Sequence, residues 1–373
     1  MKIAVIQNPK DRWSTKSMEI YGQELLISLE KNFKDLDINL FKFAIPPIFN
    51  LLPAKILFKF SRFKYYPAKL RGIKADVFHI VDHSFSNFIY SLDKERTVIT
   101  CHDLIPLKEI GEKNIIQDKF ALNNFKEIVK GLKEAPFVIA DSQATKRDLV
   151  ELLQIEPNKI QVIYLGKNDA FKKIVDKRSL FLFKEKNKLS DKPLILHVGN
   201  NLAYKNVEGI LRALQILKDK NIPFEFVKVG EKFTKDQAEM ISNYNLSEGI
   251  NYLGQLNNKD LVYLYNAATV LIYPSYFEGF GLPVLESLAC GLPTVISKNT
   301  SLEEIAGEAG VYVNPYNPES IAKGLDWVIS LGDKEREKLS KKCLLVSKNF
   351  SWDKTARATY GVYKKITDSM YSL

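Results

Sequence analysis

Short apolar runs alternate with amphipathic stretches along the whole chain, and this alternation restricts the possible folds more than any other feature. Such alternation is typical of a parallel sheet whose strands are joined by crossover helices. It predicts strands at 2–7, 37–43, 77–81, 97–101, 137–140 and 160–165, and again at 194–198, 224–229, 251–253, 270–273, 294–297 and 311–313. We therefore expect an α/β protein built from two doubly wound halves.

The length of 373 residues also favours two domains. The segment 165–192 is dense in Lys, Asp and Asn and lacks a clean period, so we place the interdomain connection there. We expect an N-terminal domain over 1–170 and a C-terminal domain over 190–350. A helix at 351–373, with apolar residues at helical spacing, is expected to pack back on the first domain.

The composition of the chain argues against several classes of protein. No stretch approaches the ~20 apolar residues of a membrane span, and the N-terminus runs straight into a strand-like pattern without a signal peptide. The three cysteines are far apart, which argues against a zinc site or a disulfide framework and favours a cytosolic location. The net charge of +10 suits nucleic acid, an anionic membrane or a phosphate-bearing substrate. Because no nucleic-acid-binding signature accompanies it, we expect no nucleic-acid partner.

The most informative segment, SYFEGFGLPVLE, runs from Ser275 to Glu286 and joins an expected strand to an expected helix. In open α/β sheets, ligands bind beyond the carboxyl ends of the strands. Gly281 lets the backbone come close to a ligand, and the helix that follows offers N–H groups to a diphosphate. The carboxylates of Glu278 and Glu286 suit the hydroxyls of a sugar or ribose. The alternative is an ordinary strand–turn–helix in which Gly and Pro only mark the turn and the helix start, and Glu286 is exposed.

Two further loops follow expected strands. One contains Gly199, Asn200 and Lys205, and a lysine before a helix N-terminus is well placed to meet a diphosphate; the alternative is a solvated lysine. The other contains His102 and Asp103. A neutral imidazole there suits a sugar hydroxyl, with Asp103 orienting it, whereas the alternative is a histidine bonded within a turn.

These motifs together resemble the family 4 retaining glycosyltransferases of GT-B fold. The resemblance is carried by Glu278 and Glu286 within EGFGLPVLE, by the loop around Lys205, by HDLIP from His102, and by SQATKRD from Ser142, which we expect to cap a helix. It covers most of the chain and is densest over 194–314. It implies two Rossmann-like domains facing each other across a cleft.

The resemblance also implies roles for individual residues. Glu278 would contact the donor hexose and Glu286 the nucleotide ribose, while Lys205 would bind the diphosphate. Catalysis would involve Glu278, His102 and Lys205, with Asp103 on the acceptor side. The other donor-binding residues would be Gly199, Asn200, Ser275, Phe280, Gly281 and Leu282.

The chain departs from the family pattern in two places. Tyr204 and Asn200 stand where relatives often carry an arginine. The segment from Asn8 to Tyr21 stands where relatives carry a Gly-Gly turn, so no ligand contact is carried over to it.

The activity implied is transfer of a hexose, with retained configuration, from a nucleoside-diphosphate sugar to a hydroxyl acceptor. GDP-mannose is preferred over UDP-linked hexoses, and the acceptor would be a glycan or a lipid-linked glycan in cell-surface polysaccharide or glycolipid assembly. No cofactor and no metal would be needed, since Lys205 and helix amides neutralise the diphosphate. The alternatives are a nucleotide-sugar 2-epimerase and a non-catalytic, membrane-associated binding protein.

One stretch of the first half has an unusual composition. Residues 39–75 contain no acidic residue, and eight basic residues between Lys42 and Lys74 interleave with apolar ones. A basic, apolar surface helix suits an anionic membrane, which would place the protein on the inner face of the membrane. The alternative is a core-packing insertion with a solvated basic face.

Two patterns that could suggest a metal are interpreted as unrelated to one. His79 and His83 lie four apart but straddle a strand end, without a set of acidic partners. The Asp-x-Asp pattern at Asp35 and Asp37 falls at a helix-to-strand junction among charged residues. We therefore expect no metal site.

Overall fold

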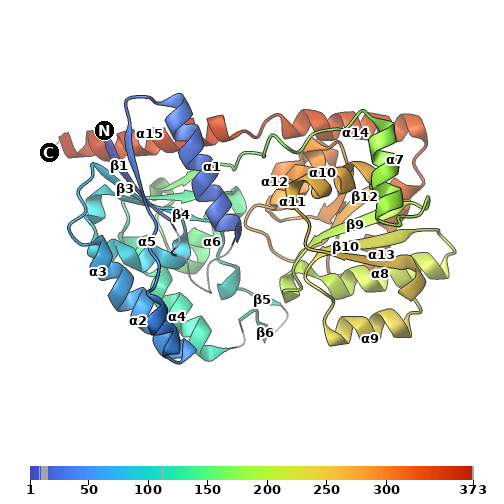
Figure 1. Ribbon diagram of the computed structural model, residues 1–373, viewed down its shortest axis with the longest axis horizontal. Coiled ribbons are helices and arrows are strands. Elements are labelled where there is room, and N and C mark those ends of the chain that lie inside the picture. The colour runs from blue at the N-terminus through green and yellow to red at the C-terminus, as the bar shows by residue number, and fades with distance from the viewer. Residues whose placement is uncertain (8, 10–15, 111–112, 117, 372–373) are drawn as a thin grey trace. The chain divides into compact units, whose positions relative to one another are not determined.

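The computed structural model describes residues 1–7, 9, 16–110, 113–116 and 118–371, which form two compact units (Figure 1). Residues 1–166 and the chain from Ser351 onward make up the first unit, and Lys167–Phe350 makes up the second. Each unit is built around its own parallel sheet, as the alternating pattern predicted.

The first sheet has the strand order β2-β1-β3-β4-β7-β8, and all its neighbours pair in parallel. Buried apolar side chains from one face of the strands, such as Ile80, Ile99 and Val138, form the centre of one core cluster. Its strands are β1 (Lys2–Ile6), β2 (Asp37–Phe41), β3 (Val77–Ile80), β4 (Thr97–Cys101), β7 (Phe137–Ala140) and β8 (Ile160–Val162), and a separate hairpin pairs β5 (Glu109–Ile110) with β6 (Lys113–Asn114).

The second sheet has the order β11-β10-β9-β12-β13-β14 and is also parallel throughout. The order changes direction between β9 and β12, and ligands of open α/β sheets bind at such a switch point. The strands are β9 (Leu194–Gly199), β10 (Glu225–Gly230), β11 (Ile250–Gly254), β12 (Val270–Tyr273), β13 (Thr294–Ser297) and β14 (Gly310–Val313).

Helices connect successive strands in both units (Figure 1). The first unit contains α1 (Lys16–Asn32), α2 (Ala54–Phe60), α3 (Tyr66–Leu70), α4 (Lys119–Val129), α5 (Gly131–Glu134), α6 (Gln143–Leu153) and α15 (Trp352–Tyr371), with a π-helical turn over Ser61–Tyr65 between α2 and α3. The second contains α7 (Lys177–Lys186), α8 (Val207–Asp219), α9 (Lys235–Asn243), α10 (Asn258–Ala267), α11 (Leu282–Ala289), α12 (Ser301–Ala306), α13 (Pro318–Ile329) and α14 (Asp333–Ser347).

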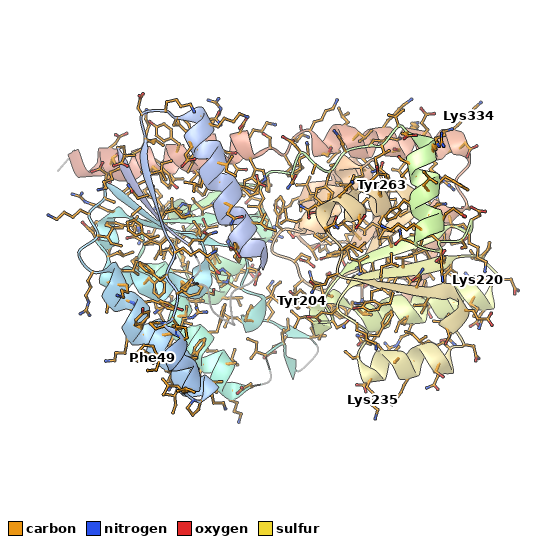
Figure 2. All side chains as sticks on the ribbon, viewed as in Figure 1. Phe49, Tyr204, Lys220, Lys235, Tyr263 and Lys334 are labelled. Atoms are coloured by element: carbon orange, nitrogen blue, oxygen red, sulfur yellow. The ribbon has the colours of Figure 1, made fainter. Side chains whose placement is uncertain are left out.

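The charged segment 165–192 is not a plain connection. It contains α7, whose N-terminus is capped by the carboxylate of Asp176. Phe183 of α7 stacks on Tyr263 of α10 with ring centroids 5.5 Å apart (Figure 2), so this helix belongs to the second unit. The apolar residues of α7 are consecutive, from Leu180 to Phe183, and Phe181 and Leu182 are exposed. They therefore show no helical period in the sequence.

The C-terminal helix α15 belongs to the first unit, packs against α1 and crosses it (Figure 1). Its apolar residues Ala356, Val362 and Ile366 are almost fully buried. The hydroxyl of Tyr363 lies 2.7 Å from Nδ1 of His79 on β3, so the helix also completes a polar contact inside the sheet. Among the helices of the described residues, none combines the length and apolar character needed to cross a bilayer.

Candidate functional site

The loop between β12 and α11 is fixed by close packing. Gly281 has φ +107° and precedes α11; a Cβ there would lie 2.3 Å from Cδ2 of Leu302. Only glycine fits both the backbone conformation and the space. The hydroxyl of Ser301, at the start of α12, donates to the carbonyls of Glu278 (2.9 Å) and Phe280 (3.0 Å). The loop is therefore held from α12, and α11 begins directly after it.

Lys205 and Glu278, predicted to bind different parts of one ligand, contact each other. Nζ of Lys205 lies 2.6 Å from Oε1 of Glu278 and 2.8 Å from the hydroxyl of Tyr273. The two charged side chains are only 10% and 7% exposed. Burial would lower the pKa of Lys205, but the Glu278 carboxylate outweighs it and raises the pKa well above its usual value. The site thus contains a buried ammonium next to a buried carboxylate.

Aromatic rings surround this ammonium group. Nζ of Lys205 lies 5.0 Å from the ring centroid of Tyr204 (Figure 2) and 4.9 Å from that of Tyr273. Cation–π attraction over two faces adds to the ion pair in holding the amine. The tyrosine found where relatives often carry an arginine therefore packs against the lysine.

Asn206 connects three loops at the ends of the strands. It adopts a left-handed conformation (φ 57°), and its side-chain oxygen caps α8 by accepting from the amide of Gly209. Its side-chain amide donates to the carbonyls of Pro274 (3.1 Å) and Pro315 (2.7 Å). The main-chain amide of Tyr276 also donates to the carbonyl of Tyr204 at 2.8 Å. The Lys205 loop and the Glu278 loop are consequently one connected element.

Glu286 lies in α11 and is half-buried, contrary to the alternative of an exposed residue. The hydroxyl of Tyr265, on α10, donates to its Oε2 at 3.0 Å. Desolvation raises the pKa of Glu286 to about 7, although the bond from Tyr265 lowers it. This carboxyl group therefore changes its charge near neutral pH.

The remaining predicted donor-binding residues lie in the same unit. Asn200 accepts from the amide of Leu202 in a local turn, and Gly199 ends β9. Ser275 is fully buried, and its Oγ has no hydrogen-bond partner among the described residues; the same holds for Nε2 of His197 on β9. Buried polar atoms without partners are uncommon in folded proteins.

His102 and Asp103 belong to the first unit, at the end of β4. Nδ1 of His102 lies 2.5 Å from Oδ2 of Asp141, and Nε2 lies 2.8 Å from the carbonyl oxygen of Val81. The Val81 carbonyl only accepts, and an ionised Asp141 does too, so this arrangement favours an imidazolium. Burial lowers the pKa of His102, but the Asp141 carboxylate outweighs it and raises that pKa to about 9.

The structure differs from the His102 prediction in two details. The oxygens of Asp141 and Val81 face the two ring nitrogens, which favours a charged ring over the predicted neutral one. The orienting carboxylate is that of Asp141 at the end of β7, since Asp103 turns away and accepts from the amide of Ile105 at 3.0 Å. Both N–H groups of His102 bond within the first unit.

His79 and His83, four residues apart in the sequence, bond to different groups. His79 bonds to Tyr363 through Nδ1 and to Thr100 through Nε2, at 2.7 Å each. Nδ1 of His83 accepts from the main-chain amide of His102 at 3.3 Å. Across the described residues, no three His, Cys, Asp or Glu side chains come together as a metal site would require.

The basic, apolar stretch contains α2, the π-helical turn and α3, and it is only partly a surface. Ile48, Leu51 and Ile56 are exposed, whereas Leu70 is fully buried. Arg62 is buried too, with its guanidinium 3.6 Å from the ring centroid of Phe85. The stretch therefore packs into the core and also presents apolar residues to solvent.

Several supporting residues were missed by sequence reasoning: Asp141, Asn206, Tyr265, Tyr273 and Ser301. All of these except Asn206 contact a site residue far away in the sequence, so no local pattern identifies them. Asn206 carried a signal, since an asparagine next to Lys205 at a helix start is a candidate N-cap.

Comparison with known proteins places both units in described families. A model of glycosyl transferases group 1 matches residues 178–343, and a model of glycosyltransferase family 4 matches residues 31–170. The chain is 28% identical over 301 residues to the O-antigen chain mannosyltransferase B of Escherichia coli, covering 79% of this chain and 76% of that protein. It is 31% identical over 245 residues to an uncharacterized glycosyltransferase of Methanocaldococcus jannaschii, covering 62% and 61%.

Other relatives are much longer or more distant. The serotype-specific mannosyltransferase WbdA of Escherichia coli is 28% identical, but the match covers only 34% of its length. Among solved structures, sucrose-phosphate synthase from Thermosynechococcus elongatus has a TM-score of 0.72 at 21% identity, covering 99% of both chains. HepE of Anabaena, solved with UDP and glucose, has a TM-score of 0.73 at 17% identity, covering 100% of both. These two similarities concern the fold.

Proposed function

This chain belongs to the family 4 glycosyltransferases and has the GT-B fold, and we propose that it transfers a hexose from a nucleoside-diphosphate sugar to a hydroxyl acceptor with retained configuration. The second unit would hold the donor, and the first would hold the acceptor.

The observation that carries this proposal is the buried pair of Lys205 and Glu278 beside the start of α11. A diphosphate needs cationic or N–H partners, and a hexose needs an acceptor for its hydroxyls; the ammonium group, the helix N-terminus and the carboxylate supply these. They lie at the β9–β12 switch point, where α/β sheets bind ligands. A donor phosphate would replace Glu278 as the partner of Lys205, which would free the carboxylate for the sugar.

In the proposed reaction, Glu278 contacts the hexose and Glu286 the ribose, while main-chain groups of Phe280, Gly281 and Leu282 hold the diphosphate. The acceptor hydroxyl attacks on the face from which the diphosphate leaves, and a leaving phosphate oxygen takes its proton. The bond to the leaving oxygen breaks as that to the acceptor oxygen forms. Lys205 stabilises the departing diphosphate, so we propose that no metal is required.

The donor we propose is GDP-mannose, with UDP-linked hexoses next. The mannosyltransferase names of the Escherichia coli relatives support mannose. The same names support a glycan acceptor in polysaccharide assembly. The whole molecule is proposed to work in the cytoplasm, at the inner face of the membrane.

We further propose that the stretch from Lys42 to Lys74 contacts an anionic membrane. Exposed Ile48, Leu51 and Ile56 provide apolar contact, and the stretch lacks acids. Two of its basic residues contribute less, because Lys42 pairs with Glu19 and Arg62 is buried. Flotation with anionic liposomes tests this part, and failure to bind at low salt would remove it.

A transfer assay tests the function directly. The full chain is incubated with GDP-, UDP- and ADP-sugars and a glycan acceptor, and the product anomer is assigned by NMR. Glu278→Gln should lower kcat by at least about 100-fold, because a neutral amide replaces the carboxylate at the sugar. Glu248→Gln, at an exposed glutamate of the same unit, is the control and should leave kcat unchanged.

The same assay separates the alternatives. A 2-epimerase would convert the donor sugar without acceptor. A binding protein would neither transfer nor hydrolyse any donor. Transfer by Glu278→Gln at the wild-type rate would contradict the role of Glu278, and an inverted product would contradict retention.

A further inference from the structure

The first unit contains a cavity of about 480 Å³ between α2 and α4, here named the α2–α4 pocket. Its wall is mostly apolar and includes Phe58 from α2 and Phe120, Ala121, Phe125 and Ile128 from α4. Phe58, Phe120, Ala121 and Phe125 are half-buried, so the pocket is open to solvent. The volume lies within the range of small-molecule sites, roughly 300–1,000 Å³.

Cations line the same pocket. Nζ of Lys55 lies 4.9 Å from the ring centroid of Phe120, and Nζ of Lys59 lies 5.4 Å from it. Arg62 donates to the carbonyl of Ser84 at the pocket wall. The one acidic residue in the described lining is Asp118, whose carboxylate caps α4 by accepting from the amide of Phe120 at 2.8 Å. The pocket thus combines an apolar interior with positive charge.

An apolar interior bordered by cations fits an amphiphile with an anionic head. A free phosphate would leave the aromatic wall empty, and a neutral hydrocarbon would not use the lysines. The surrounding stretch 39–75 has no acidic residue, and Ile56 of α2 is 55% exposed. Both features favour a ligand that arrives from an anionic, apolar surface.

We propose that the α2–α4 pocket binds a lipid phosphate, with its hydrocarbon chain between Phe58, Phe120 and Phe125 and its phosphate against Lys55 and Lys59. The inference rests on the proposed function and deepens it, because it makes the acceptor a phosphate-linked lipid carrying a glycan. The phosphate binds through charge-assisted N–H···O bonds, and no covalent step occurs in the pocket.

Alkyl phosphates below their micelle concentration provide the probe. Calorimetry on the full chain should show affinity rising about fourfold for each added methylene from butyl to octyl phosphate, until the pocket is full. Inorganic phosphate and octanol should both bind at least tenfold more weakly than octyl phosphate. An affinity independent of chain length would overturn the proposal.

Matched variants locate the binding. Ala121→Trp fills the pocket and should weaken octyl phosphate at least tenfold, whereas Ala68→Trp, at an exposed site on α3, should not. Lys55→Glu with Lys59→Glu should lose binding, and Lys64→Glu with Lys74→Glu, at exposed positions of the same stretch, should retain it. If both members of either pair lose octyl phosphate binding equally, the proposal is overturned. The chain-length series uses the native chain, so it tests the proposal even if a variant fails to fold.

Two readouts separate this inference from the function it rests on. All variants could bind anionic lipid vesicles equally while no alkyl phosphate binds. This result would show attachment to the membrane surface only and would overturn the pocket proposal. Transfer to a short, water-soluble glycan should be unchanged in Ala121→Trp. If the native chain transfers hexose but binds no alkyl phosphate, the pocket proposal fails and the proposed function stands. If it binds alkyl phosphate but transfers no sugar from any donor, the proposed function fails and the pocket stands.

Discussion

Each unit contains a buried pair of oppositely charged side chains. Lys205 pairs with Glu278, and His102 pairs with Asp141. A buried charge that loses its partner is costly, about 3–5 kcal/mol, so removing one member destabilises more than the pair contributes. Neutral variants of similar shape are therefore the informative ones at these positions.

The imidazolium of His102 leads to a titration experiment. In the native chain its pKa, about 9, should keep the ring charged at neutral pH. In Asp141→Asn, burial acts without the carboxylate, so the pKa should fall below the ordinary value of about 6.5. Nitrogen NMR of the imidazole over pH 5–10 measures both, and equal pKa values in the two proteins would contradict the assignment.

The same pair links stability to pH. Because the folded pKa of His102 lies above its unfolded value, its contribution is complete below about pH 6.5 and is lost as the pH rises towards 9. Denaturant unfolding should show this fall in the native chain but not in Asp141→Asn. Asp103→Asn, whose carboxylate does not bond to His102, is the control and should keep the native profile.

The proposed ribose contact of Glu286 predicts that donor binding depends on pH. Its pKa of about 7 means that the carboxylate needed by ribose hydroxyls forms only as the pH rises through that value. Affinity for a nucleoside diphosphate should therefore increase between pH 6 and 8. Tyr265→Phe removes a bond to the carboxylate, which raises the pKa further and should move the midpoint to higher pH; an unmoved midpoint would exclude Glu286 from ribose binding.

At the scale of elements, the loops after β9 and β12 form one framework through Asn206, and α12 holds the second loop through Ser301. The start of α11 thus has a fixed position relative to Lys205. Preorganised N–H groups bind and stabilise charge without a reorganisation cost, which is why the framework matters for a diphosphate.

A glycine pair tests this framework. Gly281→Ala places a Cβ 2.3 Å from Leu302 at φ +107°, so it should lower the free energy of unfolding by about 2 kcal/mol or more and weaken donor binding. Gly361→Ala, in α15 with no atom within 4 Å of the added Cβ, should stabilise by about 0.5–1 kcal/mol. Chemical denaturation measures both; a harmless Gly281→Ala would show that the loop can rearrange.

Most of the elements were predictable because their signals are local. All twelve strands of the two sheets were expected within a few residues, and Ser142 caps α6 as predicted. The cap of α10 is Asn257, the first of two adjacent asparagines. The helices α7, α9, α12 and α14 lie in charged or short segments that show little helical period.

The site was predictable only in part. Glu278 and Glu286 were predicted from their position after a strand, and Lys205 from the family resemblance. The structure shows that Glu278 and Lys205 contact each other. The partner of His102 could not be found, because Asp141 meets it through the pairing of β4 with β7. Half of the segment from Asn8 to Tyr21, for which no ligand contact was carried over, lies outside the described residues.

At the scale of the whole molecule, the chain divides into a continuous second unit and a first unit completed by the C-terminal helix. The first unit needs α15, because Tyr363 and Ile366 are fully buried in it. Each unit has a parallel sheet and its own apolar core, which is the condition for folding as a domain.

Fragments test this division. Residues 167–350 should fold alone with a cooperative thermal transition. Residues 1–166 should be aggregated or molten, and a chain joining 1–166 to 351–373 by a flexible linker should recover cooperative unfolding. Circular dichroism distinguishes these outcomes, and a stable, cooperative 1–166 fragment would show that α15 is dispensable.

The account depends most on Lys205 binding the diphosphate of the donor and Glu278 binding the neighbouring hexose, and calorimetry of GDP and GDP-mannose with two variants measures this directly. Lys205→Met should weaken both ligands about 10- to 100-fold, since each loses a charge-assisted bond to phosphate. Glu278→Gln should leave GDP binding within threefold of native while removing the extra affinity contributed by the mannose. If GDP binds equally to native protein and Lys205→Met, or if Glu278→Gln leaves the mannose contribution intact, the assignment is contradicted.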